Sequence, residues 1–396
     1  MRASREIDLT RGKPFRVLAR FAVPVIVGNI LQLFYTLADS VVIGQTLGAA
    51  SLAAAGSTSI IIYFVFCFIN GFTGGFGICL GQRFGARDER GMRRSIAVST
   101  LLSAAFTVLL TVVCCLLAHP VLDWMQVPEE IETQAYDYMF IVLLGTGATV
   151  FYNMVSNILR ALGDSRTPLY FLMLSSVLNV ILDVLFIVPL RMGVAGAAWA
   201  TVLAQLLSGL LSLLVGWRRF PVMHLVRADF RDLRPEAAAH LKIGFTMGFQ
   251  MSVMCIGQLA MQAAVNALGA AAIAGYTAAT KVDQFSVLIN GAFGVAIANY
   301  AAQNYGARAY GRIRSGVRAA LVQIECANVL MAALMLLCRR QVVSLFIDNP
   351  TDEIIAYATG YFTAVAPFYL LLGLLMVYRS TEQSMDDSRS PFAACM

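Results

Sequence analysis

Ten long apolar segments dominate the sequence, and each is long enough to cross a lipid bilayer as a helix. A helix needs about 20 apolar residues to cross the hydrocarbon core. The segments cover residues 15–43, 52–81, 95–117, 134–160, 168–190, 194–217, 241–265, 272–303, 317–337 and 354–378. Their apolar runs are continuous rather than alternating, which argues against a transmembrane β-barrel. Because 59% of the residues are hydrophobic and only 13% are charged, we expect an all-α polytopic membrane protein rather than a soluble enzyme.

The basic residues are distributed unevenly between the connections. Of the 29 Lys and Arg residues, 25 lie in alternate connections or at their edges, and the opposite connections hold only Arg191, Arg339 and Arg340. Lys and Arg remain on the cytoplasmic side during insertion. We therefore predict a cytoplasmic N-terminus in a prokaryotic cytoplasmic membrane. The net charge of +6 is explained by this orientation, and no nucleic-acid partner is expected.

An internal repeat divides the chain into two halves with the same orientation. Four short motifs recur at offsets of 220 to 223 residues, among them Phe84-Gly-Ala-Arg87 with Tyr305-Gly-Ala-Arg308, and Asp164-Ser-Arg-Thr-Pro168 with Asp387-Ser-Arg-Ser-Pro391. An even number of six helices per unit predicts parallel repeats. The expected organisation is an N-terminal lobe at 1–217, a linker at 218–240 and a C-terminal lobe at 241–396. The offset places the end of a second six-helix lobe near residue 438, so we expect this lobe to lack its last two helices.

Four acidic residues interrupt the apolar segments: Asp39, Asp183, Asp283 and Glu325. An ionisable side chain within a span is a functional candidate, because hydrocarbon cannot replace its hydration. Function is favoured for Asp39 and Asp183, since neither has a basic residue within one helical turn. Glu325 is isolated in the ninth segment, and a satisfied interhelical contact is an alternative for it.

Neutral polar residues form helical stripes that predict a central cavity. Residues three or four apart lie on one helix face. The stripes and the acid proposed to line the cavity are Gln32, Tyr35, Asn153, Asn157, Gln258, Gln262 and Asp283. Hydrogen bonding between helices is an equally good explanation for each Gln and Asn. Pro24 removes a backbone hydrogen bond in the middle of the first segment, so a kink is expected there, either static or mobile.

These residues carry a resemblance to a known family. Leu33-Phe-Tyr-Thr-Leu-Ala-Asp39 followed by Val-Val-Ile-Gly44, the Gly-Ala-Arg turns, Gln303-Asn-Tyr-Gly306 and Leu162-Gly-Asp-Ser-Arg-Thr-Pro168 resemble the multidrug and toxic compound extrusion (MATE) transporters. The resemblance extends over nearly the whole chain. Within the family, the sequence is most similar in type to the prokaryotic branch that includes DNA-damage-inducible protein F. Asp386 departs from the repeat, because it occupies the position of Gly163.

The resemblance implies a secondary transporter that exports organic compounds by antiport with H⁺ or Na⁺. Two six-helix lobes would alternate in access to the two sides of the membrane. The ion-coupling residues of the family correspond to Asp39, Asn179, Asp183 and Thr201, and the bending proline corresponds to Pro24. Na⁺ could bind at these four residues, since two adjacent carboxylates hold a proton or a cation more cheaply than two charges.

The expected substrates are small amphipathic compounds, and the acids favour substrates of positive charge. No cofactor other than the coupling ion is implied, the other contacts are membrane lipids, and a monomer is predicted. A flippase for lipids or polysaccharide precursors and a non-transporting fragment remain alternatives. A membrane enzyme is not favoured, because the three His residues are scattered and no HExxH or GxSxG motif occurs.

Overall fold

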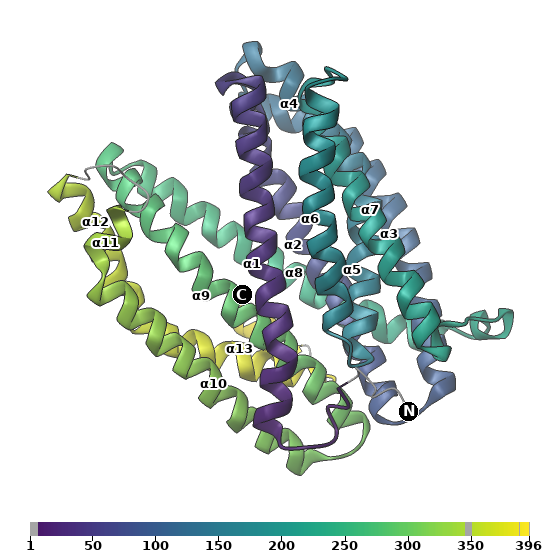
Figure 1. The fold of residues 1–396 in the computed structure, drawn as a ribbon. Coiled ribbons are helices and arrows are strands. Elements are labelled where there is room, and N and C mark those ends of the chain that lie inside the picture. Colours follow the sequence, from purple (N-terminus) through teal and green to yellow (C-terminus); the bar gives the residue numbers. More distant parts are fainter. Residues whose placement is uncertain (1–6, 345–350, 388, 396) are drawn as a thin grey trace. The chain divides into compact units, whose positions relative to one another are not determined.

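The computed structural model describes residues 7–344, 351–387 and 389–395, which are helical apart from short connections. Figure 1 shows the helices along the chain. Their bounds are α1 Pro14–Leu47, α2 Ala49–Gly85, α3 Glu89–Trp124, α4 Glu129–Leu144, α5 Thr146–Ala161, α6 Arg166–Ile187, α7 Gly193–Arg219, α8 Arg234–Asn266, α9 Ala270–Gly306, α10 Tyr310–Leu337, α11 Arg339–Ser344, α12 Asp352–Val365, α13 Phe368–Ser384 and α14 Arg389–Cys395. Two short 3₁₀ turns, η1 Pro221–Met223 and η2 Arg227–Phe230, lie between α7 and α8.

The structure bears out the predicted membrane-spanning helices. Within the described residues, eight helices are long and apolar enough to cross a membrane, and the number rises to ten when two bent pairs each count as one span. The bent pairs are α4 with α5, at 40°, and α12 with α13, at 47°. The protein is thus an integral membrane protein of the all-α class.

Contacts divide the chain into two units. Unit 1 contains Leu31–Ser252, and unit 2 contains Ile7–Ile30 together with Val253–Met396. The boundaries fall within α1 and α8, whereas the sequence-based boundaries follow the connection at 218–240. The first half of α1 joins unit 2 because Asn29 donates to the Leu288 carbonyl at 3.2 Å and Gln323 donates to the Phe15 carbonyl at 2.6 Å. The lobe boundaries predicted from the sequence stay a prediction.

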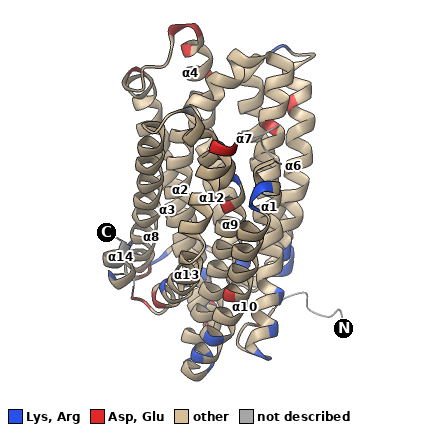
Figure 2. Cartoon of the chain, turned by 90° about the vertical axis from the view of Figure 1, so that its left-hand side faces the viewer, with Lys and Arg blue, Asp and Glu red and all other residues tan. Residues whose placement is uncertain are grey.

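Unit 1 is built around α2, which packs against α3, α4 and α5. Its core contains a group of phenylalanines in ring contact, with the ring centroids of Phe72 and Phe106 4.3 Å apart. The start of α8 lies close against α2, since a Cβ placed on Gly75 would be 2.7 Å from the Gly244 nitrogen. The α3 and α4 helices run antiparallel, so the acidic first turn of α4 lies at the opposite end of unit 1 from the basic start of α3 (Figure 2).

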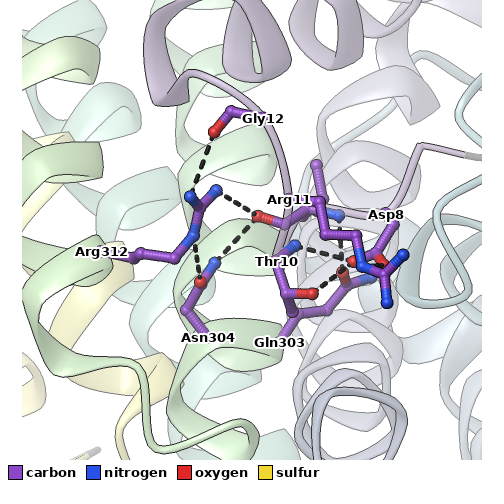
Figure 3. Close-up of polar contacts among 8 residues, drawn as sticks. Asp8, Thr10, Arg11, Gly12, Gln303, Asn304 and Arg312 are labelled. Atoms are coloured by element: carbon purple, nitrogen blue, oxygen red, sulfur yellow. Dashed lines mark hydrogen bonds and ion pairs between the residues drawn. The ribbon is translucent and has the colours of Figure 1, made fainter.

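Unit 2 packs α9 against α10, α12 and α13. A short segment of turns before α1 completes its core, because Leu9 is fully buried in the same cluster as Tyr300 and Ile324. The backbone N–H of Leu9 donates to Gln303 at 3.1 Å, and its carbonyl accepts from Asn304 at 3.1 Å (Figure 3). Arg312 also donates to the Gly12 carbonyl at 3.1 Å (Figure 3). The Gln-Asn-Tyr-Gly motif therefore fastens the segment before the first span to the end of α9.

The repeat is visible in the backbone of both units. Arg87 and Arg308, which end the two Gly-Ala-Arg turns, both have a φ of 55°. Asp164 accepts from the backbone and hydroxyl of Thr167, and Asp387 accepts from the backbone and hydroxyl of Ser390 in the same way. Asp386 keeps the left-handed conformation of Gly163, with φ of 69° against 87°. Asp tolerates this conformation better than most residues, which explains how the turn is retained without glycine.

Candidate functional site

A pair of acidic side chains lies inside unit 1, where α1 meets α6. Asp39 is 9% exposed and Asp183 is fully buried, and the two carboxyl groups lie within hydrogen-bonding reach of each other. One oxygen of each, Oδ1, is buried without a hydrogen-bond partner in the described part of the chain, and none of the ion pairs there involves either acid. Two touching carboxylates cannot both carry charge cheaply. The arrangement is suited to holding one proton or one cation.

Asn179 and Thr201 extend this pair into a group of oxygen ligands. Asn179 lies one turn before Asp183 on α6 and contacts the Thr201 hydroxyl of α7 at 3.4 Å. With its amide turned to satisfy both neighbours, it donates to Asp183 at 3.1 Å and accepts from the Thr201 backbone at 3.2 Å. The four residues predicted to couple the ion are therefore neighbours in space. The described residues contain no cluster of three His, Cys, Asp or Glu side chains for a metal, so a cation here would also need amide and hydroxyl oxygens.

Two tyrosines border the acid pair, and the sequence indicated only one of them. Tyr35 lies one turn before Asp39, and its ring reaches Thr201. Tyr138 of α4 lies close enough to interact with Asp39, Tyr35 and Asp183. Sequence reasoning missed Tyr138 because α4 has no clear polar stripe. A weak signal was present, since Gln134 lies one turn earlier and bonds to Ser51 of α2 at 2.8 Å.

A polar pocket adjoins the acid pair, and Tyr35 belongs to both. It is lined by Gln32, Tyr35, Phe66, Asn70, Thr149, Tyr152, Asn153, Leu172, Ser175, Ser176, Gln205 and Ser208. All of these side chains are uncharged, and Thr149 is held to Gln205 at 2.6 Å. Three of the residues predicted to line a cavity in this unit reach the pocket, namely Gln32, Tyr35 and Asn153. The fourth, Asn157, instead bonds to Thr73 of α2 at 3.3 Å, which is the interhelical role that the sequence left open.

The other predicted cavity residues belong to unit 2. Gln258 is exposed, and Gln262 bonds to Asn266 one turn later at 2.9 Å. Asp283 accepts a hydrogen bond from Tyr361 at 3.1 Å and a shorter one from Tyr369. Its two oxygens are thus both supplied with hydroxyl donors, unlike those of the acid pair in unit 1.

Pro24 lies in the part of α1 that belongs to unit 2, and it is buried there. The helix continues through Pro24 without interruption from Pro14 to Leu47. The missing backbone N–H leaves one carbonyl of the preceding turn without its helical partner. A bend at this position stays a prediction.

The fold and the acid pair define a polytopic membrane protein with two adjacent acidic side chains inside one helical unit. Comparison with known proteins gives the particular family. The MatE family model matches residues 24–185 and 247–396. The chain therefore belongs to the MatE family, which is the MATE family that its motifs resemble.

Individual relatives agree with this assignment. The chain is 31% identical over 373 residues to the probable multidrug resistance protein YpnP of Bacillus subtilis, covering 93% of this chain and 82% of YpnP. It is 24% identical over 390 residues to DNA damage-inducible protein F of Escherichia coli, covering 93% of this chain and 82% of that protein. Among solved structures, an outward-facing multidrug resistance MATE family transporter aligns with a TM-score of 0.90 at 23% identity, over 100% of this chain and 88% of that one.

Proposed function

We propose that this protein is a secondary active exporter of small amphipathic organic compounds, coupled by antiport to an inward flow of H⁺ or Na⁺. The observation that carries the proposal is the contact between Asp39 and Asp183 without a basic partner in the described residues. An isolated acid pair in a membrane-spanning unit binds a small cation reversibly, whereas a pair locked to Arg or Lys would not. The multidrug resistance names of the relatives support the same function.

Coupling follows if the two conformations of the transporter bind the cation unequally. A ligand shifts a conformational equilibrium only by its difference in affinity for the two states. When the cation is bound, the net negative charge of the acid pair falls. Asp39 in the first span then no longer needs to be solvated to the same extent. Tyr35 borders both the acid pair and the pocket, so ion binding changes the surroundings of the cargo.

The pocket supports cargo without negative charge. Its lining holds amide, hydroxyl and aromatic groups and no Lys or Arg, so an anionic headgroup would find no charged partner there. Aromatic faces attract organic cations, and Tyr35, Tyr152 and Phe66 provide them. We further propose that the basic ends of the helices face the cytoplasm of a prokaryotic cell and that the protein acts as a monomer.

The test uses the full chain reconstituted in vesicles, with ethidium as the probe. A proton gradient and a sodium gradient are imposed separately, and ethidium fluorescence reports the transport. We expect one of the two gradients to drive ethidium against its own concentration gradient. The proposal is wrong if neither gradient does so in vesicles whose protein is shown to be folded by its thermal unfolding transition.

A further inference from the structure

Unit 2 contains a second acid within a span, the half-buried Glu325 of α10, for which the ion-coupling scheme has no role. Both carboxyl oxygens of Glu325 are inaccessible to water and have no hydrogen-bond partner in the described part of the chain. The side chain lies against Asn328, one turn later. On the other side it faces α13, because a Cβ built on Gly373 would lie 3.0 Å from the Glu325 carboxyl carbon and 2.7 Å from the Asn328 amide nitrogen.

The neighbouring amides have no hydrogen left to donate to this carboxyl group. Asn328 gives one N–H to the Tyr369 carbonyl at 2.8 Å and the other to Asn290 at 3.3 Å. Asn290 gives one N–H to the Ser286 carbonyl at 2.8 Å and the other to Asn328 at 2.7 Å. A carboxylate only accepts hydrogen bonds, so the charged form of Glu325, whose two oxygens are inaccessible, would have no donor bound to it in the described part of the chain. The protonated form carries its own donor, and each amide oxygen here accepts one bond and can accept a second.

Asp283 provides the contrast within the same unit. Its carboxylate accepts from the hydroxyls of Tyr361 and Tyr369, which is the environment that a charged carboxylate requires. Tyr369 links the two acids, because its hydroxyl bonds to Asp283 and its carbonyl bonds to Asn328. The cluster adjoins the start of α13, where the pair α12 and α13 bends by 47°.

We propose that Glu325 is a proton-binding site of unit 2. At neutral pH its side chain is a neutral carboxylic acid, and it lies near the bend between α12 and α13. The titratable and charged groups on the elements packed around it include Asp283 of α9, Tyr361 of α12, and Tyr369 and Arg379 of α13. Of these, Asp283 is satisfied by the two tyrosines, and Arg379 is directed to the sulfurs of Met254 and Met376. Release of the proton would leave an unsolvated charge beside Asn328, so deprotonation requires the contact between α10 and α13 to open.

This site goes beyond the proposed function and can be tested without transport. Infrared difference spectra are recorded on the purified full chain in lipid vesicles at neutral pH. Subtracting the spectrum of Glu325→Gln from that of the unmodified chain should leave the carbonyl band of one protonated carboxylic acid. Subtracting Asp283→Asn, which is the matched control, should leave carboxylate bands instead. A carboxylate band in the Glu325 difference would overturn the proposal.

A second measurement needs no variant at this position. A lipophilic carbodiimide reacts with protonated carboxyl groups, and mass spectrometry locates the label. We expect label at Glu325, its loss as the pH is raised enough to ionise the acid, and none at Asp283. Label at Asp283 with none at Glu325 would contradict the assignment. Gly373→Ala, which places a methyl group between Glu325 and Asn328, should shift the pH at which labelling of Glu325 is half maximal.

Discussion

The two units share a backbone plan but place their acids in different helices. The paired breaks, the left-handed turn residues and the Asp caps recur in both units. The acids do not recur: at an offset of 221, Glu325 corresponds to Ala104, and at 220, Asp283 corresponds to Tyr63. Asn70 and Asn290 do correspond, yet Asn70 lines the pocket of unit 1 whereas Asn290 is buried against Asn328. The repeat thus fixes the scaffold, while the polar chemistry is specific to each unit.

The surroundings of the acids differ as well. Asp39 and Asp183 face each other and each has one oxygen without a hydrogen-bond partner in the described residues, whereas Asp283 has two hydroxyl donors of its own. We therefore propose ion coupling for unit 1 and a structural or cargo-binding role for Asp283. Variants in the two units test that division.

Replacing an acid of the pair should lower the rate of gradient-driven transport far more than replacing Asp283. Typical coupling free energies correspond to changes of 5- to 150-fold, so we expect Asp183→Asn to lower gradient-driven ethidium efflux by about 100-fold. Asp283→Asn should lower it by at most about tenfold, mainly through a weaker apparent affinity for ethidium. Initial rates of efflux over a range of ethidium concentrations separate these effects. Equal losses in the two variants would remove the distinction between the units.

The capping Asp of unit 1 should matter more for stability than its repeat in unit 2. Asp164 is 1% exposed and bonds to Arg219 at 2.5 Å as well as to Thr167, whereas the hydrogen bonds of Asp387 are exposed. Removing a buried charged partner and a cap together costs about 2–4 kcal/mol, so Asp164→Ala should lower the unfolding temperature clearly. Asp387→Ala should cost about 0.5–1 kcal/mol, the usual value of an exposed cap. Thermal unfolding in detergent measures both, and a larger loss in Asp387→Ala would contradict the comparison.

Tyr138 tests whether the border of the acid pair contributes to ion affinity. Tyr138→Phe keeps the ring that packs near Ile43 and Ile187 and removes only the hydroxyl. The hydroxyl lies close to both acids, and a polar group of this kind contributes about 0.5–1.5 kcal/mol, so the apparent affinity for the coupling ion should fall by about two- to tenfold. Tyr136→Phe, on the same helix, is the matched control and should leave this affinity unchanged. An identical response of the two variants would exclude Tyr138 from the site.

Removing the glycine from the turn at Gly163 and introducing one in the turn at Asp386 should change the stability of the protein in opposite directions. Gly163→Ala should destabilise by about 1–2 kcal/mol, because alanine is strained at positive φ. Asp386→Gly should stabilise by up to about 1 kcal/mol, because it relieves the same strain in the second copy. Denaturation midpoints of the two variants give the signs. Two shifts of the same sign would show that the turns are not equivalent.

Much of the fold follows from the sequence because the bilayer imposes helix lengths. The ten segments are found as eight helices and two bent pairs, and the offset of 221 anticipated the recurrence of the turns. The breaks near Gly145 and Pro367 were not predicted, because apolar composition continues through them, although the glycine and the proline there were signals of the kind used for Pro24. The sequence also did not indicate that the first half of α1 would join unit 2, because this depends on contacts such as that of Asn29 with Leu288.

The acids and the amide of the candidate site could be predicted from the sequence, but Tyr138 beside them could not. Asp39 and Asp183 stand out because charge is rare within apolar segments, and their resemblance to family motifs named their partners Asn179 and Thr201. Tyr138 and the donor-poor surroundings of Glu325 could not be inferred, because both depend on which side chains face each other across helices. Hydrogen-bond donors around an acid, and not its mere presence in a span, distinguish Asp283 from Glu325.

The most direct test of the account separates uphill from downhill movement of ethidium in vesicles containing Asp39→Asn, with Asp123→Asn, at an exposed position near the end of α3, as the control. We expect Asp39→Asn to let ethidium equilibrate across the membrane but to lose its accumulation against a gradient, while Asp123→Asn keeps both. Gradient-driven accumulation by Asp39→Asn at the rate of the unmodified protein would show that the acid pair is not the coupling site.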